Sequence, residues 1–78
     1  MYLLDEQDAI RWKILDFLYD EPRQLASISL IKKEISSFRR LKKDEQKVII
    51  DFMIRNKDIY PINKDKNIFK LDWVSPLS

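Results

Sequence analysis

The last third of the chain has the pattern of a helix that runs directly into a small β-hairpin. Apolar residues recur at helical spacing over residues 44–56, and strand-like segments follow at 59–62 and 67–73. Two shorter helical segments come earlier, so the predicted order is helix, helix, helix, hairpin. A domain of only 78 residues has few ways to arrange these elements around one core. The sequence therefore predicts a small α+β fold.

The first half supplies two helices and a short strand. Asp5 is the predicted N-cap of the first helix, which ends at residues 20–22 because proline pushes the residue before it out of the α region. Residues 25–28 alternate and are too few for a helix, so we predict a brief strand that pairs with the hairpin. Ser29 or Ser27 then caps a second helix that runs to about residue 37.

The hairpin has a predicted edge and a predicted inner face. Pro61 cannot donate a ladder hydrogen bond, which confines its strand to an edge. The polar loop at 63–67 is expected to use Asn and Asp in left-handed conformations, because the chain has no glycine. Phe69, Leu71 and Trp73 are predicted to face inward.

The third helix has a predicted core face and a second apolar stripe. The core face is predicted to be Val48, Ile49, Phe52 and Met53. Phe17, Ile35, Phe52 and Leu71, one from each helix and one from the hairpin, are expected to lie in one core. Ile50 and Ile54 lie about 100° beyond the core face, among charged residues. Either residues 2–4 of the same chain or a second copy would cover them.

Composition excludes several classes of site. The absence of cysteine and histidine removes disulfides, thiolate or imidazole metal sites and the usual nucleophilic pairs. The absence of glycine removes glycine-rich phosphate loops. No apolar run approaches the roughly 18 residues of a membrane span. We therefore expect no enzyme activity, cofactor, metal, small-molecule substrate or membrane contact. The expected location is the cytoplasm, or the nucleus in a eukaryote.

Charge is distributed unevenly along the chain. Residues 1–22 carry six acidic and two basic side chains, a balance of −4, whereas residues 23–47 carry eight basic and three acidic side chains, a balance of +5. This asymmetry favours a polyanion that faces the middle of the chain, with the acidic first helix turned away. A solvated basic surface is the alternative.

The basic residues form the candidate site. They are Lys32, Lys33, Arg39, Arg40, Lys42, Lys43, Lys47, Lys64 and Lys66. If the third helix enters a major groove, its first residues face base edges, and the preceding loop and hairpin tip contact phosphates. The predicted groove-facing residues are Lys42, Lys43, Gln46 and Lys47, with Gln46 as an adenine reader. Arg39 and Arg40 are predicted phosphate clamps, with Lys64 and Lys66 at the hairpin tip.

These segments together resemble a winged helix-turn-helix domain over about residues 5–73. The resemblance is carried by residues 14–18, 25–28, 30–35, 48–53 and 59–73. The N-terminal half is also loosely similar to the DNA-binding head of Mga-like regulators of Gram-positive bacteria. The resemblance implies one domain over 1–78, with three helices, a C-terminal hairpin wing, a short strand between the first two helices and a frayed tail at 74–78. It also implies binding of double-stranded DNA in transcription or replication.

Two features depart from that family and favour an alternative. The turn at 36–43 is long, basic and free of glycine, and the third helix begins with Asp44 and Glu45. Winged helices also serve as protein-interaction modules, so fold does not settle function. The alternative is therefore a protein-interaction module, with a homodimer or another protein bound on Ile50 and Ile54.

Overall fold

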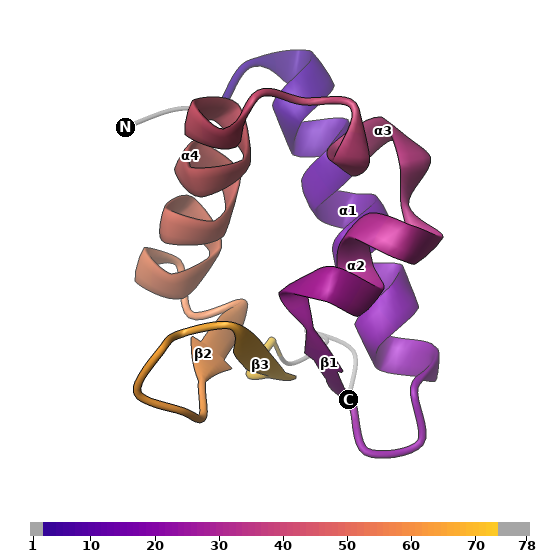
Figure 1. Ribbon diagram of the computed structural model, residues 1–78, viewed down its shortest axis with the longest axis vertical. Coiled ribbons are helices and arrows are strands. Elements are labelled where there is room, and N and C mark those ends of the chain that lie inside the picture. The colour runs from indigo at the N-terminus through magenta and orange to yellow at the C-terminus, as the bar shows by residue number, and fades with distance from the viewer. Residues whose placement is uncertain (1–2, 74–78) are drawn as a thin grey trace.

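The chain folds as a helical layer with a small sheet at one end (Figure 1). The computed structural model describes residues 3–73, which contain four helices and one three-stranded sheet. The elements are α1 (Asp5–Asp20), β1 (Leu25–Ser27), α2 (Ile28–Glu34), α3 (Ser36–Arg39), α4 (Lys43–Arg55), β2 (Ile59–Pro61) and β3 (Ile68–Leu71). The predicted α+β class is confirmed, with one helix more than expected.

The sheet joins the two halves of the chain. Its order is β1-β3-β2, with both pairings antiparallel, so β3 is central. Phe69 pairs with Ala26 on one side and with Pro61 on the other. Both strand predictions are thus confirmed: the segment before α2 pairs with the hairpin, and the proline lies on an edge. Phe69 and Leu71 are buried as expected, whereas the predicted tail at 74–78 lies outside the described residues.

The helix ends differ from the prediction in two places. Leu4, not Asp5, is the N-cap of α1, and its N–H donates to Gln7 Oε1 at 3.0 Å. Ser27 caps α2 by accepting from the Leu30 N–H at 3.1 Å. The second helix does not continue to residue 37, because Ile35 is extended and a new helix, α3, starts after it. Serine hydroxyls compete for backbone hydrogen bonds, which accounts for the weakness of a continuous helix there.

The buried side of α4 is rotated from the predicted face. Val48 was expected in the core but is 38% exposed, whereas Ile50 was expected outside it and is only 8% exposed. Phe52 is half-buried rather than central. Ile54 and Leu3 are partly buried and pack against the core. The prediction that Ile50 lies outside the core is therefore wrong, and Tyr2, its suggested cover, is outside the described residues.

Among residues 3–73, three residues adopt left-handed backbone conformations: Gln24, Lys57 and Lys66. The prediction that Asn or Asp would do so in the hairpin loop is wrong, because Lys66 takes that conformation. Lys57 follows the C-cap of α4 and has a φ of 60°. Its N–H donates to the Ile54 carbonyl at 3.1 Å, and the Asp58 N–H donates to the Met53 carbonyl at 2.8 Å. These two bonds make a Schellman motif, in which glycine usually takes the left-handed position.

Replacing Lys57 with glycine is expected to raise the free energy of unfolding by roughly 0.5–1 kcal/mol. A side-chain-bearing residue pays about 1–2 kcal/mol for the left-handed conformation, which exceeds glycine's added chain entropy of about 0.5–1 kcal/mol. Urea denaturation measures the change. Arg55→Gly, at the last residue of α4, where the backbone is helical, is the control and should destabilise by up to about 1 kcal/mol. A loss of stability in Lys57→Gly would contradict the strain argument.

Candidate nucleic-acid interface

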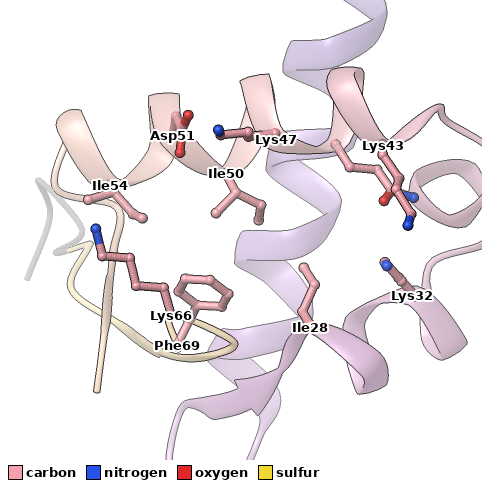
Figure 2. A pocket seen from close by; sticks show the side chains of 10 residues that line it. Ile28, Lys32, Lys43, Lys47, Ile50, Asp51, Ile54, Lys66 and Phe69 are labelled. Atoms are coloured by element: carbon pink, nitrogen blue, oxygen red, sulfur yellow. The ribbon is translucent and has the colours of Figure 1, made fainter. Parts of the chain in front are cut away.

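A shallow groove of about 300 Å³ lies between α4, the start of α2 and the hairpin loop (Figure 2). Its inner surface is apolar and comes from all three parts: Ile28, Ile50, Ile54 and Phe69. Its charged lining consists of four lysines and one carboxylate: Lys32, Lys43, Lys47, Lys66 and Asp51. Figure 2 shows the Lys32 and Lys43 ammonium groups pointing toward one another at one end, while Lys66 extends toward Ile54 at the other.

Hydrogen bonds hold the hairpin loop in a conformation in which Lys66 lines this groove. Asn63 Oδ1 accepts from the backbone N–H groups of Asn67 and Ile68 at 3.1 and 3.2 Å. The Ile28 N–H, at the start of α2, donates to the Asn67 carbonyl at 2.7 Å. The loop is therefore attached both to itself and to α2. Its left-handed residue, Lys66, lies beside the groove rather than at a free loop tip.

The groove carries a net formal charge of +3, since one aspartate offsets one of its four lysines. The lysines come from α2, α4 and the hairpin loop, which are far apart in the sequence. Concave surfaces with low-dielectric walls concentrate the field of such charges. The groove therefore presents a local positive field to an anionic partner, even though the whole chain has a net charge of only +2.

The structure brings together some of the predicted site residues but not all of them. Lys43, Lys47 and Lys66 line the groove. Five other basic candidates lie outside its lining: Lys33 in α2, Arg39 and Arg40 at the end of α3, Lys42 at the N-cap of α4, and Lys64 in the hairpin loop. Lys32 also lines the groove. The sequence includes it among the basic candidates but gives no reason to assign it a particular contact.

Gln46 has a different environment from the predicted one. Its side chain is buried, and Nε2 donates to the Phe38 carbonyl at 3.0 Å and to the Arg39 carbonyl at 3.5 Å. These carbonyls belong to the last two residues of α3, and the Phe38 carbonyl also accepts from the Leu41 N–H at 3.1 Å. Gln46 also lines the groove, but its amide supports α3, and the donor needed to read adenine is already engaged.

The outward face of α4 is not basic. Its exposed residues are Asp44, Val48 and Arg55, and Asp51 lies where this face borders the groove. The carboxylates of Asp44 and Asp51 would repel a phosphate backbone. Two of the three basic side chains of α4, Lys43 and Lys47, lie on its groove side. The candidate interface is therefore the groove and the hairpin loop rather than the outward face of the helix.

A buried ion pair holds the end of α4 against α1. Arg11 donates from Nε to Asp58 Oδ2 at 2.6 Å and from Nη2 to Asp58 Oδ1 at 3.1 Å. Asn56 Nδ2 adds a third bond to Asp58 Oδ1 at 3.1 Å, and Asp8 accepts from Arg11 Nη1 at 3.0 Å. Hydrogen bonding to Asp58 raises the pKa of Arg11 above its ordinary value. This pair fixes the position where α4 turns into β2, and sequence reasoning missed it.

Comparisons with known proteins add no relative: no protein-family model, curated protein or solved structure matches this chain. Within residues 3–73, the acidic side chains do not gather in threes as metal ligands would. In the same described segment, no helix is both long enough and apolar enough to cross a membrane. Inference about function therefore depends on the groove itself.

Proposed function

We propose that this domain binds duplex DNA, with the groove between α4 and the hairpin loop as its phosphate-contacting surface. The observation that supports the proposal is the convergence of four lysines from three separate segments on one groove. The element order is compatible with a winged helix-turn-helix, in which a helix and the wing contact DNA. In this proposal α4 is that helix, and residues 62–67 are the tip of the wing.

The chemistry of the groove favours contact with the DNA backbone over contact with base edges. Lysine ammonium groups act as flexible point charges toward phosphate, and these contacts carry no sequence information. Gln46, the side chain best suited to adenine, is buried against α3. We therefore propose binding that depends strongly on salt and weakly on sequence. A role in transcription or replication would follow from such binding.

The test is a titration of the full chain with random-sequence duplex at about 50 and 200 mM salt. Replacing Lys43 and Lys47 together with alanine should weaken binding to every sequence and flatten the salt slope by about two. The control replaces Lys13 and Arg23, which do not line the groove, and should change the slope little. Absence of binding by the unchanged protein at about 50 mM salt would overturn the proposal.

The predicted phosphate clamps need their own variant, because they lie outside the groove. Arg39→Ala with Arg40→Ala should flatten the salt slope by a further two or so if the end of α3 also contacts phosphate. An unchanged slope would confine the interface to the groove and the hairpin loop. Circular dichroism of each variant checks that a change in binding is not a loss of fold.

The apolar inner surface of the groove favours a second candidate, the binding of an acidic amphipathic peptide. The partly exposed Ile28 and Ile54 would contact the apolar side chains of such a peptide, and the surrounding lysines would contact its carboxylates. Ile54→Ser distinguishes the two candidates, because phosphate contacts do not need this side chain. A fall in peptide binding with unchanged DNA binding would favour the protein-interaction candidate.

A further inference from the structure

A second pocket, of about 250 Å³, lies on α1 and shares no residue with the groove. It is lined by Trp12, Leu15, Asp16, Tyr19 and Trp73. The first four recur at helical spacing and so lie on one face of α1, while Trp73 follows β3. Leu15 is buried at the base of the pocket, and Trp12 and Tyr19 are exposed. Large aromatic side chains therefore surround an open site instead of filling the core.

The two tryptophans meet at a right angle. The rings of Trp12 and Trp73 have centroids 6.1 Å apart and planes at 85° to each other. Tyr19 adds a third aromatic side chain to the lining, and Asp16 adds an exposed carboxylate. Aromatic ring faces carry partial negative charge and attract cations. A corner of rings with one carboxylate is therefore complementary to a positively charged group.

One cation already uses this aromatic system. The Arg11 guanidinium carbon lies 4.8 Å from the centroid of a Trp12 ring. Its charge is balanced by Asp58 and Asp8, so it leaves no unpaired positive charge at the pocket. Asp5 lies about two turns before Trp12 on the same face of α1 and adds negative charge nearby. The surroundings favour a second, external cation.

We propose that this pocket binds a quaternary or N-methylated ammonium group. A planar guanidinium cannot lie flat against two perpendicular rings at once, whereas a rounded, weakly hydrated cation can contact both. An unmodified ammonium needs acceptors for three N–H donors, and Asp16 is the only carboxylate among the lining residues. A methylated ammonium needs few or none, so aromatic walls and one counter-charge suffice. A small free cation and a methylated lysine side chain share this chemistry.

The chain provides its own reporter for the test. Its two tryptophans, Trp12 and Trp73, both line the pocket, so tryptophan emission, excited selectively over tyrosine, reports on this site. The full chain is titrated with tetramethylammonium, choline and a trimethyl-lysine peptide, with sodium chloride matching the ionic strength. All three should give a saturable change, and the tighter of the last two identifies a free cation or a protein as the source. No saturable change with any of them would overturn the proposal.

Two comparisons separate cation binding from simple apolar binding. The neutral isostere of choline, in which a tert-butyl group replaces trimethylammonium, should bind far more weakly; equal binding would overturn the proposal. Asp16→Asn should weaken choline binding by about fivefold, the equivalent of one exposed ion pair. Asp20→Asn removes another exposed carboxylate of α1, outside the pocket, and should leave the affinity unchanged. Equal weakening in both variants would show a general effect of acidity and contradict the site.

Discussion

Replacing Asp58 with alanine is expected to lower the free energy of unfolding by about 3–5 kcal/mol, the usual cost of breaking a buried ion pair. Asp58 is only 1% exposed and accepts two hydrogen bonds from the Arg11 guanidinium. Its removal leaves that guanidinium buried against Trp12 and Phe52 with one exposed carboxylate, Asp8, as its remaining partner. Chemical denaturation followed by circular dichroism measures the loss.

The same guanidinium provides a matched control. Asp8→Ala removes the other carboxylate, whose side chain is exposed, and should cost no more than about 1 kcal/mol. Arg11→Met combined with Asp58→Leu removes both buried charges and should recover much of the stability lost in Asp58→Ala, since apolar replacements of a buried pair are often neutral. A loss for Asp58→Ala no larger than that for Asp8→Ala would contradict the structural role of the pair.

The raised pKa of Arg11 adds no pH dependence near neutrality. A group whose pKa is raised in the folded state contributes its full stability below the unfolded pKa and loses it as the pH rises through the folded pKa. For an arginine that window lies in strong alkali. The contribution of Arg11 to stability is therefore constant across the neutral range.

The sequence predicts the features that depend on local signals. The α+β class, the strand before α2 and the edge position of Pro61 follow from periodicity and from the missing proline N–H, and all three are confirmed; the predicted element order lacks only α3. The Arg11–Asp58 ion pair cannot be predicted from local sequence signals. Its partners are 47 residues apart, and each one alone looks like a surface charge. Only the packing of α1 against the end of α4 brings them together.

The candidate interface was predicted in part for the same reason. Lys43, Lys47 and Lys66 lie in segments whose place in the fold follows from the element order. Lys32 could be placed only once the packing of α2 was known. The role of Gln46 could not be predicted, because its amide binds carbonyls of α3, a helix that the sequence pattern does not reveal.

The buried face of α4 differs from the predicted one because the apolar pattern of this helix does not define a single face. Apolar side chains occupy positions 48–50 and 52–54 and surround most of the helix. Such a pattern is compatible with several rotations about the helix axis, and the neighbouring elements select one of them. Here Gln46 is held by α3, while Ile50 faces the groove side with Ile28 and Phe69. The selection is tertiary, so no local signal contains it.

Replacing Ile50 with glutamate is therefore expected to lower the free energy of unfolding by about 2–4 kcal/mol, because a carboxylate would take the place of an apolar core side chain that is only 8% exposed. Val48→Glu, two residues away on the same helix, should change it by no more than about 0.5 kcal/mol, since Val48 is exposed. Thermal and urea denaturation of the two variants give the comparison directly. A larger loss for Val48→Glu would mean that α4 presents the face expected from the sequence alone. If Ile50→Glu instead kept its stability and light scattering showed that a wild-type dimer had become a monomer, Ile50 would belong to an interface and its place in the core would be wrong.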